Sequence, residues 1–133
     1  MALAIALQTN SNGQPCFEIG ERSATLYVTL TASGSYTTGG DSLDFTKITF
    51  PGGISFPIQS VPHQGWVQSQ PAAGGSASGY LYAYLNGAAI TGCKLQVFNS
   101  GGSGNPHVEL SAGAYPGGVT GDTIVGAFVF MRA

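Results

Sequence analysis

The chain has 133 residues, a length that one compact domain accounts for, and we expect a single β domain over residues 1–133. Only 8% of the residues are charged, 43% are hydrophobic, and the formal net charge is −2. The four basic residues, Arg22, Lys47, Lys94 and Arg132, are too scattered to neutralise a phosphate backbone, which argues against nucleic acid as a partner. No stretch approaches the roughly 20 apolar residues that span a bilayer, so we expect no membrane partner either.

Apolar and polar residues alternate in the first part of the chain. Residues 3–7 follow no basic residue, so we interpret them as a strand and not as the core of a signal peptide. Residues 24–31 alternate strictly, which predicts a strand with one buried and one polar face. Residues 41–48 leave two alternatives open: a strand, or one helical turn capped by Asp41 or Ser42.

Three further strands are predicted in the second part of the chain. Residues 79–86 place tyrosines on one face and leucines with alanine on the other. Residues 93–98 alternate in the same way, whereas residues 123–131 are apolar on both faces. Residues 70–79 and 99–106 are rich in glycine and serine, and we interpret them as exposed loops.

Short strands separated by glycine, proline, asparagine and serine are typical of an all-β fold. We expect an antiparallel β-sandwich or jelly-roll-like barrel with short turns and at most one short helix. A sandwich covers only one face of each sheet, so strands that are apolar on both faces need a second cover. We expect that cover to be another copy of the chain, with a subunit interface formed by Tyr80, Tyr82, Tyr84, Phe128 and Phe130.

Residue types that carry catalysis or bind metals are few and lack a recognisable spacing. Cys16 and Cys93 form no metal motif, and we expect both to be buried free thiols. His63 and His107 have no evident third ligand, although Glu109 shares a strand face with His107. Neither a nucleophile elbow nor a phosphate loop occurs. We therefore predict no enzymatic activity, no metal site and no cofactor.

Two sets of side chains allow an interpretation other than a purely structural one. A glycosidase pair could in principle come from any two of the six acids, but nothing marks two of them as partners; these are Glu18, Glu21, Asp41, Asp44, Glu109 and Asp122. Asp41 and Asp122 each follow a glycine, and a turn-forming role explains both better. Aromatic side chains could also stack on sugar rings, as in carbohydrate-binding sandwiches; these are Trp66, Tyr36, Tyr80, Tyr82, Tyr84 and Tyr115. Tyrosines at every second position of a strand favour a subunit interface instead.

Four short segments follow one another along the chain. They are a Tyr-x-Thr-Gly-Gly-Asp turn at residues 36–41, a tyrosine-rich hairpin that reaches Asn86 and Gly87, a Lys-Leu-x-Val-Phe strand at residues 94–98, and the closing segment at residues 119–130. With these motifs the chain resembles a family of small virion structural proteins of tailed phages, encoded near the major capsid protein. The resemblance implies a capsid decoration, or cement, protein: a homotrimer that binds the major capsid protein and stabilises the phage head.

The same resemblance implies a place on the capsid surface of the virion, after assembly in the host cytoplasm. Under this hypothesis the N-terminal strand, through Leu3, Ile5 and Leu7, or the loop tips would contact the capsid. The alternative function is a carbohydrate- or receptor-binding β-sandwich module of a phage tail or fibre. In that case Trp66 or Tyr82 would contact the glycan.

Overall fold

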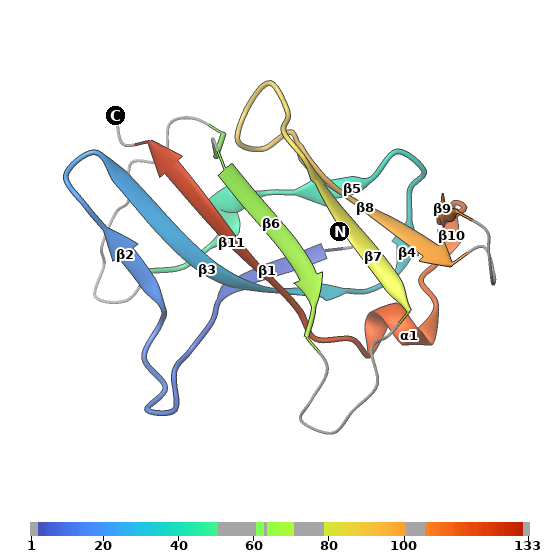
Figure 1. The fold of residues 1–133 in the computed structure, drawn as a ribbon, viewed down its shortest axis with the longest axis horizontal. Helices are drawn as coiled ribbons and strands as arrows, with labels where there is room; N and C mark the ends of the chain where they lie inside the picture. The colour runs from blue at the N-terminus through green and yellow to red at the C-terminus, as the bar shows by residue number, and fades with distance from the viewer. Residues whose placement is uncertain (1–2, 51–60, 63, 71–78, 101–105, 132–133) are drawn as a thin grey trace.

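Two antiparallel β-sheets face each other in the computed structural model of the chain (Figure 1). The structure describes residues 3–50, 61–62, 64–70, 79–100 and 106–131. The predicted fold class, an antiparallel β-sandwich with short turns, is confirmed. Within these residues no helix is long and apolar enough to cross a membrane.

The larger sheet is centred on two long neighbouring strands. Its order is β1 (Leu3–Leu7), β3 (Ser23–Ala32), β11 (Ile124–Met131) and β6 (Gln64–Ser69), and β2 (Phe17–Ile19) pairs with β3 beside β1. Every second side chain of β3 from Ala24 to Ala32 is buried, which confirms the alternation predicted for residues 24–31. The apolar face of the larger sheet therefore points inward.

The smaller sheet is built around β8 (Cys93–Ser100). β7 (Tyr80–Leu85) pairs along one side of β8, and β5 (Asp41–Leu43) and β9 (His107–Glu109) share the other side. Between β5 and β9, the hydroxyl of Tyr36 accepts a 3.2 Å hydrogen bond from the backbone N–H of Val97. That N–H group is thereby satisfied at a point where the ladder is interrupted.

The remaining elements are short. β4 (Ser35–Tyr36) pairs with β10 (Gly113–Ala114), η1 (Phe45–Lys47) is one 3-10 turn, and α1 (Gly117–Thr120) is one α-helical turn. This agrees with the expectation of very little helix.

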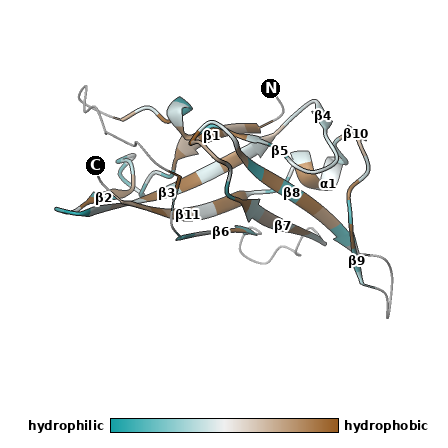
Figure 2. Ribbon diagram, turned by 90° about the horizontal axis from the view of Figure 1, so that it is seen from above, coloured by the Kyte–Doolittle hydropathy of each residue, from teal (hydrophilic) through white to brown (hydrophobic). Residues whose placement is uncertain are grey.

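The two sheets meet at both sides, so the sandwich approaches a flattened barrel. β6 lies beside β7 on one side, and β1 contacts β5 on the other, although no backbone ladder joins either pair in the described part of the chain. Figures 1 and 2 both show β6 and β7 side by side. Because the sheet edges adjoin each other, the outer faces of the two sheets are the main surfaces left for partners.

Aromatic rings fill the space between the sheets. Phe45 from η1 meets Phe128 and Phe130 of β11 edge to face, with ring centroids 4.8 and 5.1 Å apart. Tyr84 of β7 packs on Phe128 from the other sheet at 4.9 Å. One cluster of rings therefore ties both sheets to the 3-10 turn.

Residues 41–48 contain both of the alternatives that the sequence left open. β5 ends at Leu43, and the Asp44 side chain then caps η1 by accepting a 3.0 Å hydrogen bond from the N–H of Thr46. The predicted caps, Asp41 and Ser42, lie in the strand instead.

The predicted loops also differ from the observed ones. β8 extends through Ser100, so residues 99 and 100 belong to a strand. The predicted hairpin joins β7 to β8, but through residues 86–92 rather than through Asn86 and Gly87 alone. Residues 71–78 and 101–105 of the predicted loops lie outside the described residues.

Candidate functional site

The outer face of the larger sheet carries almost no charge. Strands β1, β3, β6 and β11 contain no Asp, Glu, Lys or Arg, and Glu18 of β2 is the exception in this sheet. Threonines, glutamines and apolar residues take the outward positions. Away from Glu18, such a face has no charged group to desolvate when another molecule covers it.

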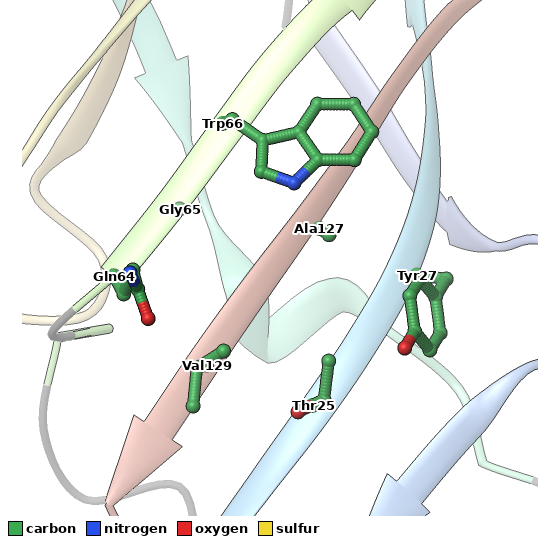
Figure 3. Close-up of a pocket in the computed structure, with 7 residues that line it drawn as sticks. All are labelled: Thr25, Tyr27, Gln64, Gly65, Trp66, Ala127 and Val129. Atoms are coloured by element: carbon green, nitrogen blue, oxygen red, sulfur yellow. The ribbon is translucent and has the colours of Figure 1, made fainter.

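A groove of about 330 Å³ lies on this face, across β3, β11 and β6 (Figure 3). Its largest side chain is Trp66, which is 49% exposed. In Figure 3 the indole lies broadside over β11, next to its register partner Ala127. The other lining residues are Thr25, Tyr27, Gln64, Gly65 and Val129, and none of them is charged.

The outward side chains of β11 are covered mainly by their neighbours in the sheet. Val125 lies in register between two polar residues, and Ala127 lies between Tyr27 and Trp66; both are buried. Met131, at the end of the strand, is exposed. The two-sided apolar pattern predicted for this strand is present, but a second molecule is not needed to cover its centre.

An apolar patch lies on the outer face of the smaller sheet. Leu81 and Leu85 of β7 are 51% and 39% exposed. Ala83 lies between them on the same face, and Phe98 of β8 is the register partner of Leu81. We call these four side chains the leucine patch. Adjacent exposed leucines on a strand are typical of a contact surface.

The tyrosines of β7 point the other way, toward the core of the same chain. All three predicted interface tyrosines, Tyr80, Tyr82 and Tyr84, pack against that core. Tyr84 donates its hydroxyl to Sγ of Cys93 over 3.1 Å, and Tyr82 donates to Oδ2 of Asp122 over 2.7 Å. Burial, and then the hydrogen bond to Cys93, raises the pKa of Tyr84. These rings are thus engaged within one chain.

The other predicted contact residues also lie inside the chain. Phe128 and Phe130 are 0% exposed, Leu3 and Ile5 are buried, and Leu7 packs against the same core. Pairing of β1 with β3 turns these three β1 side chains toward the smaller sheet. Leu3, Ile5, Phe128 and Phe130 are buried within their own chain in the described conformation, so the surfaces proposed below use other residues.

Asp41 and Asp122, for which a turn-forming role is predicted, are engaged by hydroxyl groups of their own chain. Asp41 is buried and accepts hydrogen bonds from the N–H of Thr37 (3.0 Å) and from the Tyr115 hydroxyl. Asp41 therefore holds a turn, as predicted. Asp122 instead accepts hydrogen bonds from two side chains, Oγ of Ser69 (2.8 Å) and the hydroxyl of Tyr82. It joins the end of β6 to β7, where no backbone ladder is present in the described residues.

Glu109 is bound to the Tyr-x-Thr-Gly-Gly-Asp turn. Its Oε1 accepts hydrogen bonds from the Tyr36 hydroxyl (2.8 Å) and from the N–H of Gly39 (2.6 Å). His107, two residues earlier, is exposed, and His63 lies outside the described residues. Glu109 thus fixes a turn from the neighbouring strand.

No three His, Cys, Asp or Glu side chains of the described ranges lie close enough together to hold a metal ion. Cys16 and Cys93 are both free; Cys93 is buried, whereas Cys16 is only half-buried. Cys93 shares its buried face with Leu95 and Val97, as the alternation predicted.

Comparison with known proteins gave no relative: no family model, no curated protein and no solved structure matches the chain. The resemblance to tailed-phage structural proteins therefore depends on the sequence motifs alone.

Proposed function

We propose that the chain is a virion structural protein of a tailed phage: a capsid decoration protein that self-associates and binds the major capsid protein on the head. The observation that carries this proposal is the leucine patch, because Leu81 and Leu85 are large apolar side chains that lie exposed on the same face of one strand. The turn, hairpin and strand motifs that resemble the phage family supply the viral context.

Self-association through the leucine patch follows from the hydrophobic effect. Covering apolar surface contributes about 25 cal/mol per Å², and the low charge of the chain adds little repulsion between copies. In a cyclic trimer, the patch of one copy covers a different surface of the next copy, so the ring closes without leaving the leucines exposed. The described sheet edges adjoin one another, which favours a contact between faces over added strand pairing.

The proposed action on the head is mechanical and needs neither a cofactor nor a catalytic step. A trimer that bridges neighbouring capsomers adds contacts that must break before the shell can open. Binding to the assembled shell then stabilises it by mass action, as any ligand of a folded state does. The protein would act on the capsid surface after assembly in the host cytoplasm.

Light scattering of the purified chain tests the self-association. We expect a trimer for the native sequence and a monomer for the double variant Leu81→Lys with Leu85→Lys. Ile19→Lys is the matched control, since Ile19 of β2 is 39% exposed, the same fraction as Leu85, but lies on the other sheet. A monomeric native chain, or a double variant that still forms trimers, would contradict the assigned patch.

Co-sedimentation with expanded heads of the encoding phage tests the capsid partner. The native chain should sediment with the heads, and the double variant should do so more weakly, because it loses the multivalency of the trimer. Failure of the native trimer to bind heads would contradict the decoration function while leaving the self-association intact.

A second candidate function is a receptor- or carbohydrate-binding module of a tail or fibre. The exposed Trp66 in an uncharged groove is the observation that favours it. Immunogold labelling of intact virions distinguishes the two functions, since a decoration protein labels the head and a receptor-binding module labels the tail.

A further inference from the structure

The Trp66 groove has a chemical composition that differs from that of the leucine patch. The four side chains of the leucine patch are aliphatic or aromatic, and their polar neighbours on β8 are Gln96 and Lys94, the register partners of Ala83 and Leu85. The groove instead combines one large aromatic ring with uncharged hydroxyl and amide groups. Thr25 and Tyr27 come from β3 and Gln64 comes from β6, and they surround an apolar floor on β11 (Figure 3).

The polar groups of the groove are free to bind a ligand. Within the described part of the chain, no side-chain hydrogen bond engages the hydroxyls of Thr25 and Tyr27, the Gln64 amide or the indole N–H of Trp66. Together they offer both donors and acceptors next to an exposed ring. A surface that served only to pack against another apolar face would bury these groups without partners, which is costly.

The shape of the groove suits a flat ring. The Trp66 indole lies broadside over β11, so one of its broad faces is turned toward the sheet and the other outward (Figure 3). An exposed aromatic face stacks against the C–H face of a sugar ring, while the ring hydroxyls hydrogen-bond to amides and hydroxyls at its edge. The volume of about 330 Å³ lies at the lower end of the range for small-ligand pockets.

The charges around the groove limit the ligand further. No lysine or arginine lines it, so phosphates and nucleotides lack a counter-charge there. The nearest acid in the ladder is Glu18, the register partner of Thr25, and a carboxylate at that position repels anionic ligands. A neutral ligand is therefore favoured over a sialylated or sulfated one.

From these observations we propose that the Trp66 groove binds a neutral saccharide of one or two rings. The sugar stacks on the indole of Trp66, and Gln64, Tyr27 and Thr25 hydrogen-bond to its hydroxyls. This site is distinct from the leucine patch, and it does not depend on whether the protein sits on the head or the tail.

Trp66 is the only tryptophan of the chain, so its fluorescence reports directly on the groove. A panel of neutral and anionic glycans on an array selects the saccharide, and the best neutral one is then titrated against the native protein. We expect the emission of Trp66 to change saturably with that saccharide. Neutral glycans should bind, and their sialylated or sulfated derivatives should bind more weakly.

Two variants, measured by calorimetry, assign the contacts. Trp66→Ala should weaken binding more than about tenfold, as truncation of a central aromatic contact does. Gln64→Ala, an exposed position that tolerates truncation, should weaken it by a smaller factor. Thr31→Ala is the control: Thr31 lies on the same face of β3 but outside the groove, and affinity should not change.

Three outcomes would overturn the proposal. One is an array without binding to any neutral glycan, and another is an affinity that neither variant alters. The third is a native oligomer that dissociates when Trp66 becomes Ala while Leu81 and Leu85 are intact, which would assign the groove to a contact between subunits. None of these results depends on head binding, so the decoration function is tested separately.

Discussion

Packing of the larger sheet against the aromatic core depends on the absence of one side chain. A side chain at Gly65 of β6 would point inward, toward Phe128, its register partner on β11. A Cβ atom at this position would lie 2.4 Å from Cδ1 and 2.8 Å from Cε1 of the Phe128 ring. Because Phe128 also contacts Phe45 and Tyr84, its ring has little room to move away.

Replacing Gly65 by Ala should therefore destabilise the fold by about 1–3 kcal/mol, the usual cost of overpacking a core. Gly117→Ala is the matched control, since no atom lies within 4 Å of a Cβ placed there, and it should change stability by less than about 0.5 kcal/mol. Urea unfolding of the two variants measures the difference. Equal midpoints for both variants would show that the Phe128 ring adapts.

At the scale of the elements, no backbone ladder joins β6 to β7 in the described residues, and side-chain hydrogen bonds link these two strands instead. Asp122, just before β11, accepts one hydrogen bond from Ser69 at the end of β6 and one from Tyr82 of β7. A single carboxylate thus links three strands from both sheets. The sequence could not reveal this link, because a Gly-Asp pair predicts a local turn and contains no information about distant hydroxyls.

Asp122→Ala should lower the free energy of unfolding by about 1–3 kcal/mol, because it leaves the Tyr82 hydroxyl without this acceptor. Asp122→Asn keeps an acceptor oxygen and should lose less. Hydrogen exchange should localise the effect to the backbone amides of β6 and β7. If exchange increases equally in β1 and β3, the loss is global and Asp122 does not act at this junction.

For the molecule as a whole, strands with a clear alternation of apolar and polar residues could be predicted from the sequence. Features that depend on how one strand lies against another, such as the side of β7 that faces the core, could not. The alternation in residues 24–31 identified the buried side of β3 correctly, because polar threonines mark the other side. In β7 both sides are apolar, so the pattern could not show that the tyrosines face inward and the leucines outward. β6 was not predicted at all, since Gln-Gly-Trp-Val-Gln-Ser lacks clear alternation, and the groove around Trp66 was missed with it.

Three inward-facing tyrosines are expected to make the fold less stable as the pH rises into the alkaline range. Burial is the main cause that raises the pKa of Tyr36 from 10.0 to about 12, and burial likewise raises those of Tyr84 and Tyr115. The folded chain therefore keeps these protons at a pH where the unfolded chain has released them. Their contribution to stability is complete below pH 10 and is lost as the pH rises through each folded-state pKa.

We expect the urea midpoint to be insensitive to tyrosine ionisation below pH 10 and to fall between pH 10 and pH 12. The tyrosinate absorbance that these three side chains contribute should rise mainly with unfolding, because burial opposes their ionisation in the folded chain. Tyr36→Phe should make the decline shallower, even though it lowers stability at neutral pH by removing the hydrogen bonds to Glu109 and Val97. A midpoint that stays constant up to pH 12 would mean that the described core does not exclude water from these hydroxyls.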